Sequence, residues 1–409
     1  MVGQMKLRMA VRPDPYVLVL SWLISILGIL IVFDAGYARS LEKGTLIPRE
    51  VIVQFFALLI GAFLGLCVRQ AKPETVKKVG YWSFYASLVV VALMYAFHFG
   101  IERNGAVRWI GWRDKVEIQP AEFVKLTAIL FLAGALSNRK AWPTRKFKSF
   151  ALWLDNVPIA KLKRCWPGIA VLIAVLAIVE EPDMGTGGII ALTAIAMFVL
   201  AGVHWKTLLI GFVIGVVGVV YMVHKQPYRM DRITDHNSRW SAVNRDNSGY
   251  QTTQSEVAEA SGGVFGAGIG SGRAKHVMPA ATTDFVSTTI AEELALVGIY
   301  FVLALIGVLV GRLYYLARRS DSQFSALVIL GVATWFGVQA SINIWQASGL
   351  IWAVGIPLPF ISYGGSSMVA LWLALGVCHG LVAHQPKKET VRETDSNRWR
   401  DSRTRLSGV

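Results

Sequence analysis

The stretch "YVLVLSWLISILGILIVF", residues 16–33, contains no charged side chain. A helix that crosses a lipid bilayer needs about 20 predominantly apolar residues, and this run approaches that length. It follows the basic start "MKLRMAVRPDP", and no cleavable signal peptide is evident. The pattern predicts a signal anchor that is retained as the first membrane span.

Comparable apolar runs recur along the 409 residues of the chain. Apolar residues make up 54% of the sequence and charged residues only 16%, whereas soluble domains carry about 25% charged residues. We therefore expect an all-α polytopic membrane protein. About ten spans are predicted, near residues 16–36, 51–68, 80–99, 119–137, 167–180, 187–203, 206–224, 289–316, 323–347 and 363–384.

The predicted spans divide the chain into three parts. Residues 1–15 form an N-terminus, residues 16–384 a ten-span membrane domain, and residues 385–409 a tail with little apolar content that is predicted to be disordered. Within the membrane domain, residues 225–288 form a large polar, glycine-rich loop between spans seven and eight.

Lysine and arginine are concentrated in the loops after spans two, four and eight. Basic loops stay in the cytoplasm, so an even number of spans places both termini there and the loop 225–288 outside. We therefore attribute the net charge of +15 to basic loops that set the orientation of the spans and contact anionic lipid, and not to a surface that binds nucleic acid. The three cysteines (Cys67, Cys165 and Cys378) lie outside this loop and form no C-x-x-C motif, which argues against a disulfide framework or a cysteine metal site.

Two stretches carry polar or helix-breaking residues into the membrane zone. In "GIPLPFISYGGSS", residues 355–367, the prolines cannot sustain a helix, so the segment is either a tight turn or the wall of a buried cavity. In "RNGAVRWIGWRDKVEIQPAEFVKL", residues 103–126, Glu122 and Lys125 share one face of a helix. They form either a structural ion pair or a site where Lys125 meets an anion. Arg108 is either an interfacial anchor or a phosphate contact.

Isolated acidic residues stand at the ends of several spans. Asp183 in "EEPDMGTGG" is predicted to cap a helix or form a turn, and Asp34 is predicted to lie at the membrane interface. Asp284, in "MPAATTDFVSTTIAEE", precedes the eighth span, and composition alone favours a helix cap over a catalyst there. The glycines of the long loop match no phosphate-binding motif, while Gln251 and Ser255 fall on a predicted short amphipathic helix.

Four blocks of the sequence resemble the SEDS family (shape, elongation, division and sporulation), which includes RodA, FtsW and SpoVE. In order they are "NGAVRWI…IQPAEFVKL", "PDMGT", "GYQTTQSEVAEASGGVFGAGIG…K…P…TDF…AEEL" and "QASINI…GIPLPFISYGGSS". Together they extend from about residue 100 to residue 380, and the expected number of spans agrees.

The resemblance implies a glycosyltransferase of the bacterial inner membrane that polymerises lipid II into glycan strands and releases undecaprenyl pyrophosphate. Its partner would be a class B penicillin-binding protein, a transpeptidase. Asp284 matches the family's catalytic aspartate and would be the general base. The family's cavity residues match Arg108, Glu122, Lys125, Lys275, Gln339, Asn343 and Ser366. Cations such as Lys125, Lys275 or the Arg229/Arg232 pair would meet the pyrophosphate, and Mg²⁺ or Mn²⁺ could share that task, although the sequence shows no dedicated metal cage.

The chain departs from the family pattern in three places. Ala280 and Thr282 stand where the family usually has glutamate and histidine before "TDF". Trp352 and Val354 replace a proline and a threonine, and the usual serine-rich end of the first span reads "FDAG", which contains Asp34. A lipid II flippase and a non-catalytic scaffold of the division or elongation machinery are the alternatives to a transferase.

Overall fold

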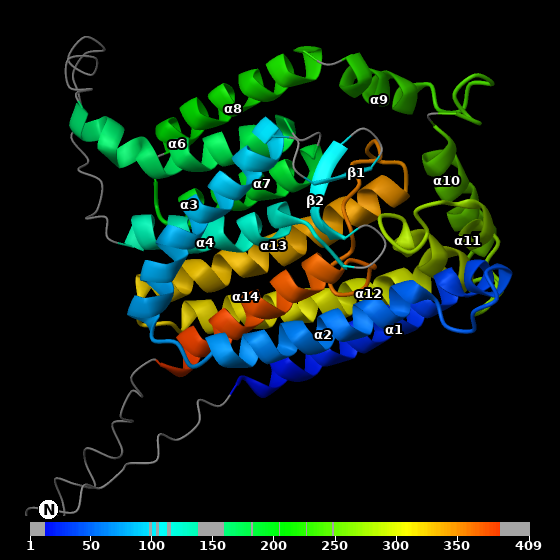
Figure 1. Cartoon of the computed structure of the whole chain (residues 1–409), viewed down its shortest axis with the longest axis horizontal. Helices are drawn as coiled ribbons and strands as arrows, with labels where there is room; N and C mark the ends of the chain where they lie inside the picture. Colours follow the sequence, from blue (N-terminus) through cyan, green and yellow to red (C-terminus); the bar gives the residue numbers. More distant parts are fainter. Residues whose placement is uncertain are drawn as a thin grey trace, which may run out of the picture.

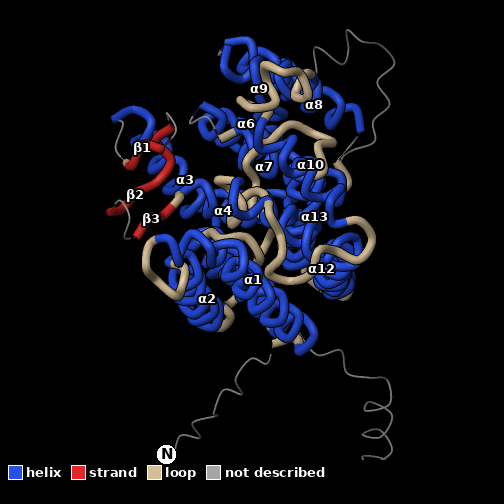
Figure 2. Tube along the Cα trace, turned by 90° about the vertical axis from the view of Figure 1, so that its right-hand side faces the viewer, coloured by secondary structure: helices blue, strands red, loops and turns tan. Residues whose placement is uncertain are grey.

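The computed structural model describes residues 13–97, 100–103, 106–112, 116–137, 159–180, 183–203, 205–225, 227–247 and 249–384. The predicted tail, 385–409, and most of the predicted N-terminus lie outside these residues. The described chain is a bundle of long helices with a small sheet at one edge (Figures 1 and 2).

Each predicted span corresponds to one long helix of the described chain. These helices are α1 (Pro15–Glu42), α2 (Arg49–Val68), α3 (Pro73–Phe97), α4 (Pro120–Ser137), α6 (Ile159–Glu180), α7 (Met184–Leu200), α8 (Trp205–Lys225), α12 (Val286–Arg318), α13 (Gln323–Ala347) and α14 (Gly365–Ala383). Seven of them, α1 to α4 and α12 to α14, are long and apolar enough to cross a membrane, and shorter apolar helices span Trp166–Val179 and Met184–Leu200. The prediction of a polytopic helical membrane protein is confirmed.

Several helices extend beyond the predicted spans. Helix α1 continues to Glu42, α3 begins at Pro73, and α6 begins at Ile159. Hydropathy marks only the apolar part of a helix, so polar turns that continue it past the bilayer escape the prediction. The start of α1 shows how such an end is fixed, because the side chain of Asp14 accepts a hydrogen bond from the Val17 N–H and Pro15 occupies the first turn.

The two ends of the bundle differ. Helices α1 and α3 begin, and α2, α4 and α14 end, at one end, which we call the terminal end (Figure 1). The opposite end, the loop end, carries the short helices α9 (Pro227–Asn237), α10 (Tyr250–Gly262) and α11 (Ala274–Val277). Helix α10 contains Gln251, Gln254 and Ser255, which confirms the predicted short helix in the long loop.

The small sheet is the one element type that the all-α prediction missed. Strands β1 (Ile101–Arg103), β2 (Ala106–Trp112) and β3 (Val116–Ile118) pair antiparallel in the order β1-β2-β3. The sheet lies beside α3 and α4 at the edge of the bundle (Figure 2). The sequence signal for this sheet is local: an Asn-Gly dipeptide precedes a run of β-branched and aromatic residues. The hydropathy of the flanking spans outweighed it in the prediction.

Small residues bring the helices together in the core. A side-chain carbon added to Gly376 of α14 would lie 2.3 Å from the Gly65 carbonyl oxygen of α2, so the two backbones are in contact. Such close approach is typical of helix packing in membranes, where association depends on van der Waals contact. This contact packs α14 against α2 and so helps to position the segment that precedes α14.

Candidate active site

Asp284 lies in a turn between α11 and α12, half-buried at the loop end of the bundle. Its main-chain carbonyl accepts two hydrogen bonds of 2.8 Å, from Asn343 Nδ2 and from Gln346 Nε2 of α13. Both amides are fully buried. The position of Asp284 is therefore fixed through its backbone, by a helix that lies far from it in the sequence.

The segment between α13 and α14 forms one side of this site. Ile356 O accepts from the same two amides, and Gln346 Oε1 accepts the N–H groups of Val354 and Gly355 at 3.1 and 3.0 Å. A side-chain carbon added to Gly355 would lie 3.6 Å from Asp284 Oδ2, so this glycine lies against the carboxylate.

The same segment also binds the turn of Asp284 directly. Ser362 Oγ donates to Thr283 O at 2.6 Å, and the Tyr363 N–H donates to Thr282 O at 2.8 Å. Residues 352–358 contain no helix. The segment is therefore more than a tight turn: it is irregular backbone that lies beside Asp284, and buried side chains of α13 satisfy its hydrogen-bonding groups.

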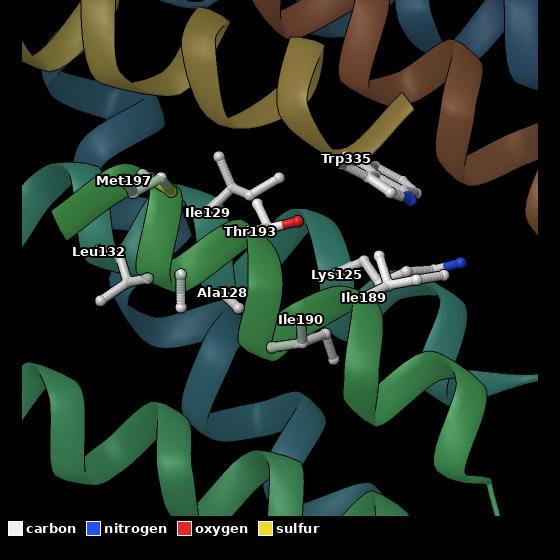
Figure 3. Close-up of a pocket in the computed structure, with 10 residues that line it drawn as sticks. Lys125, Ala128, Ile129, Leu132, Ile189, Ile190, Thr193, Met197 and Trp335 are labelled. Carbon is white, nitrogen blue, oxygen red and sulfur yellow. The ribbon is translucent and has the colours of Figure 1, made fainter. Parts of the chain in front are cut away.

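Helix α4 supports this segment through a buried cation. Lys125 Nζ lies 2.7 Å from Glu122 Oε1 and 3.2 Å from Gln339 Oε1, and 5.2 Å from the ring centre of Trp335. Gln339 Nε2 in turn donates to Pro357 O at 2.9 Å. Figure 3 shows Lys125 and Trp335 beside a small cavity of about 10 Å³ between α4, α7 and α13. The ion-pair alternative for Lys125 is present in the structure, and an anion contact remains a prediction.

Ser366 joins a third group of contacts at the start of α14. Its hydroxyl accepts the Gln119 N–H at 2.9 Å, and Gln119 Nε2 donates to Asp183 Oδ2, also at 2.9 Å. Asp183 Oδ1 accepts the Thr186 N–H at 3.0 Å and caps α7, which confirms the predicted helix cap. Arg108 lies half-buried on β2, in the sheet next to this group.

Lys275 belongs to a separate cluster at the loop end. Its ammonium contacts Asp34 Oδ1 at 2.7 Å and Glu293 Oε1 at 2.6 Å. Burial lowers the pKa of Lys275, but its hydrogen bonds to Asp34 and Glu293 outweigh this and hold the pKa above its usual value. Asp34, predicted to lie at the membrane interface, forms this ion pair, and its position relative to the membrane stays a prediction. Arg39 of α1 donates to the main-chain carbonyls of Lys275 and Met278, so α1 holds α11 by both side chain and backbone.

The glycine-rich loop binds carboxylates of the protein itself. Glu292 accepts the N–H groups of Arg273 and Ala274 at 2.8 and 2.9 Å, and Glu293 those of Gly270 and Gly272, both at 3.0 Å. Main-chain N–H groups that a phosphate-binding loop would aim at a ligand are thus used to fold the loop onto α12.

A break in α12 allows this docking. Ala295 adopts φ 52° and ψ −150°, which interrupts the helix just after the two glutamates. The carbonyls of Glu292 and Glu293 accept the N–H groups of Ala267 and Gly268 at 2.9 and 3.0 Å. The loop is therefore connected to α12 by both main chain and side chain.

Most of the predicted site residues fall into two clusters. Asp284, Glu122, Lys125, Gln339 and Asn343 contact the segment 355–367 directly or through one another, Ser366 belongs to that segment, and Lys275 lies apart with Asp34 and Glu293. Arg108 lies outside both clusters, on β2. The side chains of Arg229 and Arg232 on α9 lie outside the described residues.

Sequence reasoning missed Gln346, although it makes more of these contacts than any residue that was predicted. Gln339, Asn343 and Gln346 are spaced i, i+4 and i+7 in an apolar helix, which places three amides on one face. That spacing was the available signal.

The chain is similar to known proteins over most of its length. The FtsW/RodA/SpoVE family model, described as cell cycle protein, matches residues 15–387. The probable peptidoglycan glycosyltransferase FtsW of Coxiella burnetii is 30% identical over 368 residues, which cover 89% of this chain and 94% of that protein. Stage V sporulation protein E of Bacillus subtilis is 31% identical over 375 residues, which cover 89% of this chain and 95% of that protein.

Solved structures show the same fold. A chain in a structure on the coordination of polymerization and crosslinking by a peptidoglycan synthase complex has a TM-score of 0.71 at 25% identity, covering 91% of this chain and 99% of that one. The rod shape determining protein RodA of Thermus thermophilus has a TM-score of 0.65 at 23% identity, covering 92% of this chain and 98% of that one. The protein belongs to the FtsW/RodA/SpoVE family.

Proposed function

We propose that this protein is a peptidoglycan glycosyltransferase that polymerises lipid II, with Asp284 as its general base. The relatives named above as peptidoglycan glycosyltransferases support the activity. The observation that carries the assignment of Asp284 is its main-chain anchoring to Asn343 and Gln346. Because its main-chain carbonyl is held by α13, Asp284 is kept beside the segment 355–367, with Gly355 next to its carboxylate.

The reaction needs a base and a means of stabilising the leaving group. Asp284 accepts the proton of a hydroxyl on the acceptor sugar, and that oxygen bonds to the anomeric carbon of the donor. The bond from this carbon to the pyrophosphate oxygen breaks, and undecaprenyl pyrophosphate leaves with the electron pair, with inversion at carbon. Such proton transfer contributes roughly 100- to 10,000-fold to a rate.

The two buried lysines suit positioning better than direct contact with pyrophosphate. Lys125 is paired with Glu122, and Lys275 with Asp34 and Glu293, so the protein already compensates both charges. Separating a buried pair leaves an uncompensated charge and costs about 3–5 kcal/mol. Arg108, at the edge of the site, remains our candidate for contact with the leaving group.

A divalent cation does not fit a cage of protein ligands in the described part of the chain. No group of three or more His, Cys, Asp or Glu side chains that could hold a metal occurs among the described residues. The acidic cluster of Asp34 and Glu293 is occupied by the Lys275 ammonium and by N–H groups of the glycine loop. We derive no step through a metal.

The setting of the reaction follows from the same proposal. We place the protein in the bacterial inner membrane with both termini in the cytoplasm, which puts Asp284 on the outer side. A class B penicillin-binding protein is the proposed partner, and the fold likeness to a chain of a peptidoglycan synthase complex supports it.

The proposal is tested with purified protein and labelled lipid II, with and without a penicillin-binding protein. Asp284→Asn should abolish polymer formation, a loss of at least about 100-fold. Asp246→Asn is the matched control, because Asp246 lies exposed on the long loop and pairs only with the exposed Arg245 among the described residues.

Three outcomes separate the candidate functions. Polymer from the wild type and the control, but not from Asp284→Asn, supports the base. Polymer from Asp284→Asn at the wild-type rate refutes it. Transbilayer movement of lipid II without polymer indicates a flippase, and neither activity indicates a scaffold.

A further inference from the structure

A groove of about 450 Å³ opens between α3 and α4 near the terminal end of the bundle. Its lining contains Lys77, Lys78, Tyr81 and Trp82 from α3 and Phe131 and Gly134 from α4. Glu74 contributes the single acid of the lining, so its described charged groups sum to a positive charge. The groove lies far along α4 from Glu122 and Lys125 and takes no part in the site described above.

The charged side of the groove is built on a glycine. A side-chain carbon added to Gly134 would lie 3.4 Å from Lys77 Cγ, so the stem of Lys77 lies across this glycine. Lys77 Nζ donates to Ser137 Oγ at 3.3 Å and lies 5.7 Å from the ring centre of Phe324. Lys78 is exposed and makes no ion pair with any described residue. One lysine is thus fixed at the wall, and the next is available to a ligand.

The apolar side of the groove consists of packed aromatic rings. The Tyr81 ring lies 5.5 Å from Trp82, 5.1 Å from Tyr85 and 5.6 Å from Phe131, centre to centre. Phe131 is buried, whereas 65% of Trp82 is exposed. From Glu74 to Trp82 the groove follows nine residues of α3, and the eight steps between them rise about 12 Å at 1.5 Å per residue.

We propose that this groove binds an anionic phospholipid of the leaflet at the terminal end, with its phosphate at Lys78 and one acyl chain along the exposed rings of Tyr81 and Trp82. Lysines near a membrane surface attract anionic lipid, and tyrosine and tryptophan prefer the depth of the headgroups. The groove has its lysines at the end of the bundle, where a phospholipid headgroup would lie, and its apolar surface toward the middle, where the acyl chains would lie.

Other occupants fit less well. A soluble phosphate compound would leave the exposed indole and the apolar floor without a partner. A transmembrane helix of another protein would present apolar side chains to Lys78 at the mouth. The proposal does not depend on the glycosyltransferase activity, and its test uses no lipid II.

The test is native mass spectrometry of the full chain in detergent, titrated with phosphatidylglycerol and, separately, phosphatidylcholine of the same chain length. Lys78→Gln should weaken phosphatidylglycerol binding about fivefold, the effect of one lysine charge near anionic lipid, and leave phosphatidylcholine unchanged. Lys43→Gln is the charge-matched control, since Lys43 lies exposed in the turn after α1 at the opposite end.

A second pair of variants tests the shape of the groove. Gly134→Leu places a side chain where the stem of Lys77 now lies and should abolish the binding of phosphatidylglycerol to the groove. Gly215→Leu in α8 is its control, because a side-chain carbon at Gly215 has nothing within 4 Å. Loss with Gly134→Leu but not with Gly215→Leu supports the groove.

Several results would overturn the proposal. These are equal retention of both lipids by the wild type, an equal loss with Lys43→Gln, or unchanged binding in Gly134→Leu. Competition by glycerol phosphate as strong as by the whole lipid would indicate a free phosphate site and would also reject it.

Discussion

Replacement of Gln346 by leucine should damage the site far more than the same change at Asn343, although both amides hold Asp284. Each donates to Asp284 O and to Ile356 O, so loss of either one leaves both carbonyls with a partner. The two residues differ in their side-chain oxygens. Gln346 Oε1 accepts the N–H groups of Val354, Gly355 and, at 3.4 Å, Ile356, whereas Asn343 Oδ1 is buried without a partner among the described residues.

The magnitude follows from the groups left without partners. Gln346→Leu removes the acceptor of three main-chain N–H groups, those of Val354, Gly355 and Ile356, and of these residues only Ile356 is buried. A buried unsatisfied donor costs about 1–3 kcal/mol, and each hydrogen bond lost at the two more exposed groups about 0.5–1.5 kcal/mol. The expected loss of stability is therefore about 2–6 kcal/mol, a large share of the roughly 5–15 kcal/mol that stabilises a folded domain. Asn343→Leu leaves no such group and removes one unsatisfied oxygen, so its effect on stability should be small.

Thermal unfolding in detergent measures the loss of stability, and polymerisation of labelled lipid II measures the loss of activity. Gln346→Leu should unfold at a clearly lower temperature and should also lose activity, because a displacement of about 1 Å at a reacting group can cost about 100-fold. Equal melting temperatures for the two variants would refute the claim that the N–H groups left without an acceptor cause the loss of stability. If Asn343→Leu is stable but inactive, its free oxygen contacts substrate, as the family resemblance implies.

Two further predictions concern the loop end. Gly266→Ala should destabilise the glycine loop strongly, because its new carbon would lie 2.0 Å from Glu293 O, whereas Gly268→Ala, with a similar φ of +97° but no close neighbour in its way, should cost only about 1–2 kcal/mol. Limited proteolysis of the loop distinguishes them, and equal cleavage would contradict the proposed docking. Burial, together with the charge of Glu256, raises the pKa of Glu259 to about 7. Ionisation therefore removes stability as the pH rises from about 4.5 to 7, and Glu259→Gln should stabilise the protein at pH 8 by up to about 3 kcal/mol but not at pH 4, as thermal unfolding at the two pH values would show.

Much of the fold followed from hydropathy, because the bilayer leaves a chain few options. A long uncharged run must be a helix, since backbone groups in lipid can be satisfied only within the segment. The sheet formed by β1, β2 and β3 was not predicted, because hydropathy does not specify it. Its three strands are short, lie between two spans, and are specified by local turn chemistry that a window of about 20 residues averages away.

The site was harder to predict from the sequence, because it is made of contacts between residues far apart in the chain. Asp34 lies 241 positions before its partner Lys275, and neither residue type indicates the other. Asp183 was interpreted correctly because a helix cap is local, within three residues of its partner. Patterns of spacing reveal contacts within one element, whereas contacts between elements depend on how the helices pack.

The structure bears on the two departures of this chain beside its catalytic candidate. The turn at Ala280 is maintained by its main chain, whose carbonyl accepts the N–H groups of Thr283 and Phe285. Thr282 is buried, and its main-chain carbonyl, not its side chain, accepts the Tyr363 N–H. The geometry that fixes Asp284 therefore does not use the side chains of residues 280 and 282. Loss of the family's usual glutamate and histidine there changes the polar groups near the carboxylate but not its placement, and we expect Ala280→Glu and Thr282→His to alter the pH dependence of polymerisation more than the stability of the fold.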